Sequence, residues 1–169
     1  MMALRDKRKR QGRAGGPAAL LAGLAAAVML GVAGLGAATT ERVVTDPHTG
    51  LAISGYDPVA YFADAAARRG RPEIEARFAD AAWRFRNLGN RAAFLAHPET
   101  YMPAFGGYDP TGIARGVAVA GHPEIWLIVG ERLYLFHNED TRAAFAAEPK
   151  RFVTTAERQW REVQRTLVN

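Results

Sequence analysis

The chain has 169 residues, of which 49% are hydrophobic, enough for one domain and an additional segment. Its net charge of +5 comes from positions 1–38, which hold six basic side chains and one acidic one, whereas positions 39–169 hold sixteen of each. The basic balance therefore gives no support for nucleic-acid binding, which needs a basic patch on the folded part. The absence of cysteine excludes disulfides, thiolate metal sites and cysteine nucleophiles.

The amino-terminal residues have the layout of a targeting segment. Basic side chains between positions 5 and 13 precede a run from 17 to 38 that has no charged residue. This run exceeds the roughly 18 residues of a spanning segment, so it is predicted as an N-terminal hydrophobic helix. The small residues before Thr39 also form an acceptable cleavage site. The sequence thus predicts either an inner-membrane anchor with the domain outside the cytoplasm, or a periplasmic or secreted protein released by cleavage.

Three parts follow from this layout: residues 1–38 as signal or anchor, 39–50 as a polar linker and 51–169 as one domain. A short strand is expected at 51–53. Asp57 is placed to cap a short helix that has Pro58 at its first position. The apolar and charged alternation at 74–78 and 82–85 predicts a hairpin. Asn90 is expected to cap the next helix, which Pro98 ends.

The second half predicts the same kinds of element. Two β-rich runs, 125–129 and 132–136, surround Gly130-Glu131 and indicate a hairpin. A helix is expected from about 139 to 148, where Pro149 ends it. The last segment, 154–167, is predicted as an amphipathic helix that packs across the sheet, with one apolar stripe formed by Ala156, Trp160, Val163 and Leu167.

The two halves repeat each other. Shifting the chain by 51 residues aligns 84–101 with 135–152, and eight of these eighteen positions are identical, including Phe94 on Phe145. The tetrapeptide Gly-Tyr-Asp-Pro at 55–58 also recurs at 107–110. A solenoid needs about three units, so two units predict one domain. The expected fold class is α+β, a small antiparallel sheet of hairpins with short helices, built from two strand-helix repeats.

The order of these motifs resembles the YHS-domain family. The resemblance rests on Gly-Tyr-Asp-Pro-Val-Ala-Tyr-Phe at 55–62, the Trp83-x-Phe85 strand, Pro98-x-x-Tyr101 and the loop Phe-Gly-Gly-Tyr at 105–108, and it covers roughly 51–160. It implies a small α+β domain of the kind found alone in exported bacterial proteins and attached to heavy-metal transport ATPases. It also implies metal binding as the suspected role, with copper as the suggested ion.

One position departs from the family pattern. Family members commonly carry a cysteine directly after Gly-Gly-Tyr, and this chain has Asp109 there. A carboxylate is a harder ligand than a thiolate, so the change moves the preference away from Cu(I), towards a harder divalent metal ion or towards no metal.

The candidate ligand-binding residues are Tyr56, Asp57, Tyr108 and Asp109, which would surround one cleft if both Gly-Tyr-Asp-Pro loops face the same side. Asp109 and His137 are the candidate metal ligands. The competing interpretation of each aspartate is a capping or turn carboxylate. No nucleophile elbow, phosphate loop or dinucleotide fingerprint is present, so no catalytic residue is assigned.

Two function classes remain open at this point. The first is a non-enzymatic exported YHS-like module that binds a metal ion or small ligand. The second is a membrane-anchored protein-interaction or structural domain of the cell envelope. The expected partners are the membrane, through the N-terminal helix, and a second protein, with no role for nucleic acid.

Overall fold

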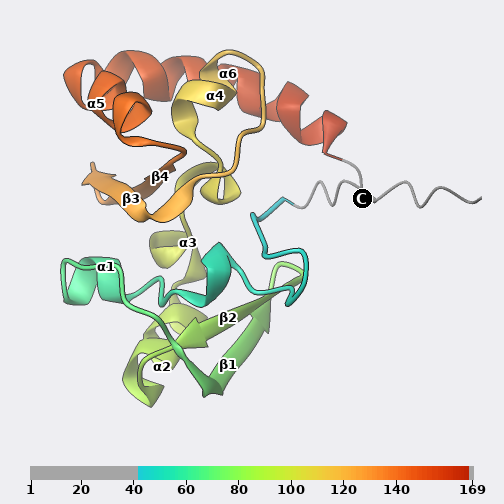
Figure 1. Cartoon of the computed structure of the whole chain (residues 1–169), viewed down its shortest axis with the longest axis vertical. Coiled ribbons are helices and arrows are strands. Elements are labelled where there is room, and N and C mark those ends of the chain that lie inside the picture. The colour runs from blue at the N-terminus through green and yellow to red at the C-terminus, as the bar shows by residue number, and fades with distance from the viewer. Residues whose placement is uncertain (1–41, 168–169) are drawn as a thin grey trace, which may run out of the picture. The chain divides into compact units, whose positions relative to one another are not determined.

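Residues 42–167 are the part of the chain described by this computed structural model, and within them one order of elements occurs twice (Figure 1). The first copy contains η1 (Ile53–Gly55), α1 (Ala60–Ala63), β1 (Arg71–Phe78), β2 (Ala81–Phe85), α2 (Leu88–Ala96) and α3 (Pro98–Tyr101). The second contains η2 (Ala104–Gly107), α4 (Pro110–Ala114), β3 (His122–Val129), β4 (Arg132–Phe136), α5 (Glu139–Ala147) and α6 (Pro149–Thr166). The predicted N-terminal hydrophobic helix lies outside the described residues.

The fold class is α+β, as predicted, with each hairpin forming its own two-stranded antiparallel sheet. Both ladders carry the same irregularity in register. It falls between Arg71 and Glu75 in β1, and between His122 and Trp126 in β3. These are equivalent positions of the two copies, so the duplication includes the bulge as well as the strands.

The two hairpin turns also match. Ala79 and Asp80 have φ angles of 50° and 61°, and Gly130 and Glu131 have φ angles of 57° and 59°. Two consecutive left-handed residues give the two-residue turn whose twist fits a hairpin. The turn at Gly130-Glu131 is the predicted one, and the first turn is one residue shorter than the predicted gap between 78 and 82, because Ala81 already pairs with Phe78 in β2.

The helix caps correct two predictions. Asp57 and Pro58 lie in the turn before α1, which begins at Ala60 after Val59 and has no side-chain cap. Asn87, and not Asn90, caps α2: its side chain accepts the backbone N–H of Asn90 at 2.7 Å. Asn138 caps α5 in the same way through Thr141. Asn90 lies inside the first turn of α2, where its side chain has a different partner, described below.

One phenylalanine of each copy fills the space between helix and hairpin. The ring centroid of Phe94 lies 4.9 Å from that of Trp83, and the ring centroid of Phe145 lies 4.9 Å from that of Tyr134. A second strand aromatic lies 5.3 Å away in the first copy and 5.2 Å away in the second. All of these rings are buried, so the two phenylalanines have equivalent environments, as the repeat predicts.

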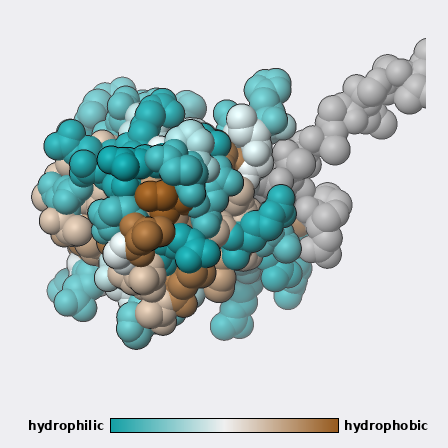
Figure 2. Space-filling view, turned by 90° about the horizontal axis from the view of Figure 1, so that it is seen from below, coloured by the Kyte–Doolittle hydropathy of each residue, from teal (hydrophilic) through white to brown (hydrophobic). Residues whose placement is uncertain are grey.

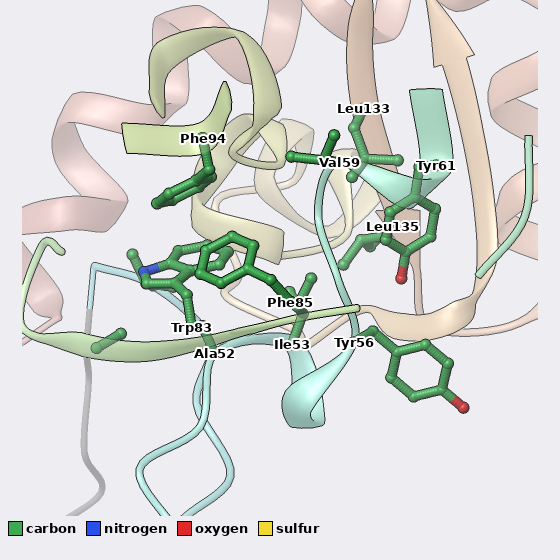
Figure 3. Packing of buried hydrophobic residues seen from close by; sticks show 12 residues of the cluster. Ala52, Ile53, Tyr56, Val59, Tyr61, Trp83, Phe85, Phe94, Leu133 and Leu135 are labelled. Carbon is green, nitrogen blue, oxygen red and sulfur yellow. The ribbon is translucent and has the colours of Figure 1, made fainter. Parts of the chain in front are cut away.

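The β3–β4 hairpin lies between the first copy and the α5 helix of its own copy, and β4 is apolar on both faces. Leu133 and Leu135 join the first copy's core, where Figure 3 shows them beside Val59 and Tyr61. The alternate side chains of β4 join Phe145 on the other face. This hairpin therefore connects the two halves into one body.

The β1–β2 hairpin, by contrast, has one face open to solvent. The positions of Trp126 and Leu135 are occupied there by Glu75 and Arg84, which pair at 2.7 Å and are partly exposed. The two hairpins have the same backbone irregularity, and their sequences differ on one face. That face of β3–β4 packs against the first copy, whereas the same face of β1–β2 is exposed to solvent.

The last helix confirms the predicted stripe but packs differently from expectation. Ala156, Val163 and Leu167 are buried and Trp160 is half-buried. These residues pack against α4 and the η2 loop, through Ile113 and other apolar side chains. The predicted packing on the sheet is confined to the start of the helix, where Phe152 and Val153 join the cluster of Phe145 and the β4 aromatics.

The chain enters this body directly after residue 42. Val43 is 2% exposed, and the Val44 backbone N–H donates to Gly106 O at 2.7 Å while its carbonyl accepts from Ile53 at 3.1 Å. The described part of the expected linker is thus hydrogen-bonded to the domain. The expected strand at 51–53 is reduced to bridges at Leu51 and Ala52. Within residues 42–167, no helix is both long and apolar enough to cross a membrane.

Candidate functional site

The two Gly-Tyr-Asp-Pro loops have the same backbone conformation. Tyr56 and Tyr108 adopt φ/ψ of −75°/150° and −75°/148° directly after a short 3-10 turn. Each tyrosine N–H donates to the carbonyl three residues earlier at 3.1 Å. The loops approach each other through Val44, which hydrogen-bonds to Gly106 and Ile53.

Asp57 is fully buried and accepts three hydrogen bonds within its own copy. Its Oδ1 accepts the Val59 backbone N–H at 2.9 Å, and its Oδ2 accepts the Arg86 backbone N–H at 2.8 Å. The side chain of Asn90 donates to the same Oδ2 at 2.7 Å. The carboxylate therefore fastens the loop to the junction between β2 and α2.

Asp109 repeats this arrangement at 1% exposure. Its Oδ1 accepts from both the backbone N–H and the hydroxyl of Thr111 at 2.8 Å, and it caps α4. Its Oδ2 accepts the His137 backbone N–H at 2.8 Å. The capping interpretation of this aspartate is thus what the structure describes, with an added bond to the start of the next helix.

These bonds occupy three of the roughly four acceptor positions of each carboxylate. A buried carboxylate without donors costs several kcal/mol, and here N–H and O–H groups supply them. A metal ion at either aspartate would have to displace donors that lie in the protein interior. Among residues 42–167, no group of three or more histidine and carboxylate side chains could hold a metal ion.

His137 reaches Asp109 only through its backbone. Its ring is exposed and its Nδ1 lies 3.3 Å from Ala120 O. The predicted pair Asp109 and His137 is therefore adjacent in space, but the imidazole and the carboxylate have different partners. Ligand binding by either side chain stays a prediction.

The two loop tyrosines face different elements. The Tyr56 hydroxyl donates to Glu124 Oε1 of β3 at 2.8 Å, and the Arg69 guanidinium carbon lies 4.7 Å from its ring centroid. Burial raises the pKa of Tyr56, and the hydrogen bond to Glu124 raises it further. Figure 3 shows its ring at the edge of the core cluster with the hydroxyl pointing outward. Tyr108 instead packs beside Trp160 of α6 at 6.1 Å.

A third tyrosine reaches from the first copy to the second. The Tyr61 hydroxyl donates to Pro123 O at 2.8 Å, and its ring meets Trp126 edge to face at 5.3 Å. Burial raises the pKa of Tyr61 strongly. Tyr56 and Tyr61 therefore both contact β3, so they join the two copies.

Sequence reasoning missed the donors that hold each aspartate. Arg86 and His137 donate through the backbone, which no side-chain pattern reveals. Asn90 and Thr111 could have been found, because each is a polar residue beside an expected cap.

The described surface also has an apolar stripe on α2. Leu88 is 71% and Leu95 is 43% exposed, and the exposed Ala92 lies between them. Spacings of four and three residues place all three on one helix face. Phe78, at the end of β1, is 38% exposed and meets Phe94 edge to face at 5.9 Å. Figure 2 views this end of the molecule and shows brown apolar atoms among teal ones.

Comparison with known proteins adds no relative: no protein-family model, no curated protein and no solved structure matches this chain.

Proposed function

We propose that this chain is a non-enzymatic, YHS-like interaction module of the cell envelope, and that it binds a protein partner through the outward face of α2. The observation that carries this proposal is the exposed stripe of Leu88, Ala92 and Leu95. The family likeness rests on the motif order alone, and the envelope location rests on the amino-terminal layout.

The internal duplication makes the stripe informative. The positions of Leu88, Ala92 and Leu95 in α2 correspond to Glu139, Ala143 and Ala146 in α5. The same helix in the same fold is thus built without either leucine. Because the equivalent helix forms without these two side chains, we infer that their exposure serves binding.

The geometry favours a particular kind of partner. Two leucines about two helical turns apart, with a small residue between them, form the contact pattern of a helix that lies in an apolar groove. We therefore expect a protein with such a groove, and not a small polar ligand, as the partner.

Metal or small-ligand binding is the first of the two function classes that the sequence left open, and the described geometry favours it less. Both aspartates already accept three hydrogen bonds each from groups of their own copy. Isothermal titration with Cu(II), Zn(II) and Ni(II) tests this class, and we expect no heat of binding. A binding isotherm for the parent protein that is absent from Asp109→Ala would make metal binding the better-supported function.

Site-specific crosslinking tests the proposed partner surface. A photoreactive amino acid replaces Ala92 in the full chain, in cells, and Ala143 of α5 is the matched control site. We expect one crosslinked species at 92 and none at 143. The double variant Leu88→Glu/Leu95→Ala gives α2 the residues that α5 has at these two positions. It should abolish the crosslink. The free energy of unfolding should stay within about 1 kcal/mol of the parent.

Two outcomes would contradict the proposal. A crosslink at 92 that survives the double variant would show that the leucines do not mediate the contact. A product of twice the chain's own mass would mean that the stripe joins two copies instead of binding a different protein.

A further inference from the structure

The C-terminal helix concentrates basic side chains on its outer face. Helix α6 carries five basic residues and two acidic ones, whereas residues 39–169 as a whole are neutral. At about 100° per residue, the basic side chains fall within a sector roughly 100° wide, directly opposite the buried stripe. They are Lys150, Arg151, Arg158, Arg161 and Arg165.

Part of this charge has no acidic partner among the described residues. Arg151 and Arg165 pair with glutamates three residues away, at 2.8 and 2.7 Å. Within 42–167, the Arg158 side chain donates one hydrogen bond, to the Thr155 hydroxyl at 3.4 Å, and neither Arg158 nor Arg161 forms an ion pair. Arg158 and Arg161, with Thr154 and Glu157, line an open depression of about 420 Å³.

The end of α6 lies beside the place where the chain enters the domain. Val44 packs in one cluster with Val163 and Leu167, and Figure 1 shows the two ends of the described chain next to each other. Only residues 39–43 separate Val44 from the uncharged run, a distance of at most about 20 Å for an extended chain. A membrane anchor at 17–38 would therefore hold α6 close to the headgroups.

We propose that the arginine face of α6 rests on anionic lipid headgroups. Phosphates of the headgroups complement the unpaired guanidinium groups, and basic residues near such a surface are attracted within a Debye length. Helix α2 lies at the opposite end of the molecule's long axis from α6 (Figure 1). Docking by α6 therefore leaves the apolar stripe of α2 directed away from the membrane.

Energy transfer in lipid nanodiscs tests the proposal with the full chain. The protein has no cysteine, so Thr154→Cys or Ala92→Cys gives a single site for a donor dye, with an acceptor on the lipid headgroups. We expect higher transfer from position 154 in discs rich in phosphatidylglycerol than in discs of phosphatidylcholine alone, and a loss of that difference at high salt, which screens the charges. Transfer from position 92 should stay below that from position 154 and should not rise in the phosphatidylglycerol discs, because docking directs α2 away from the membrane.

Charge variants separate the α6 face from general electrostatics. The triple variant Arg158→Gln/Arg161→Gln/Arg165→Gln should lower the equilibrium constant for docking by about fivefold for each arginine. Energy transfer from position 154 should then lose its dependence on the lipid. The control triple, Arg68→Gln/Arg71→Gln/Arg77→Gln, changes three arginines of the first copy and should leave it intact. Equal transfer in both lipids, or an equal effect of the control, would overturn the proposal. Salt-sensitive binding of poly-glutamate without any lipid dependence would assign the face to an acidic protein instead.

Discussion

The Asp109 carboxylate accepts the backbone N–H of His137 at 2.8 Å, and this bond has a counterpart in the first copy between Asp57 and Arg86. Donor and acceptor are separated by nearly the same length of chain in both copies. The bond depends on the backbone of the donor, so an arginine in one copy and a histidine in the other serve equally well. The motif Gly-Tyr-Asp-Pro is therefore explained by the fold of each copy.

Asn90 should contribute more to stability than its counterpart Thr141. Its side chain donates to the buried Asp57 carboxylate at 2.7 Å, whereas Thr141 lies in a capping box at the surface. Because a hydrogen bond to a charged group contributes about 1.5–3 kcal/mol, Asn90→Ala should lower the free energy of unfolding by that amount, and Thr141→Ala by about 1 kcal/mol or less. Urea unfolding measures both, and equal losses would be evidence against the role given to Asn90.

Gly70 and Gly121 should be intolerant of any side chain. A Cβ atom at Gly70 would lie 2.4 Å from the carbonyl carbon of Arg84, and one at Gly121 would lie 2.6 Å from Cβ of Leu135. Both strand starts would have to shift, so we expect each alanine variant to lose about 2–3 kcal/mol of stability.

A turn glycine provides the control for these two variants. Gly130 has φ of 57° and open space around it, and asparagine tolerates that conformation. Gly130→Asn should therefore change the free energy of unfolding by less than about 1 kcal/mol. Unchanged stability in Gly70→Ala would contradict the close approach of β1 to β2 at this point.

Stability should fall at alkaline pH because of Tyr61. Its pKa is raised above the ordinary value of 10.0 by burial, so the folded state keeps a phenolic proton that the unfolded chain loses. The contribution is fully present below pH 10 and decreases by about 1.4 kcal/mol per pH unit above it. Urea midpoints between pH 9 and 11 test this, with Tyr61→Phe as the comparison. The same slope in Tyr61→Phe would assign the effect to other tyrosines.

The duplication could be predicted from the sequence because the repeated residues are of types that particular local structures require. Two-residue turns, a proline after each helix and a phenylalanine facing each hairpin recur at a fixed spacing, and each reflects short-range geometry. The apolar stripe of α6 was readable for the same reason.

Other features depend on contacts that are distant in sequence. Asn87 and Asn90 are equally good caps locally, and the choice depends on Asp57, which holds the Asn90 side chain from the preceding loop. The apolar stripe of α6 packs on α4, because Phe145 of α5 already lies against β4, and only the start of α6, at Phe152 and Val153, joins the β3–β4 cluster. The three donors of each buried aspartate come partly from backbone groups, which have no sequence signature.

The most direct measurement is chemical unfolding of the parent, Asp57→Asn and Asp109→Asn, each with chelator and with added Cu(II), Zn(II) or Ni(II). An asparagine amide would place N–H groups against N–H donors, so we expect both variants to lose about 2–3 kcal/mol, by similar amounts, with no effect of metal or chelator on any of the three proteins. A parent protein that is stabilised by one of these ions, with the gain absent from Asp109→Asn, would contradict a purely structural role for the paired aspartates.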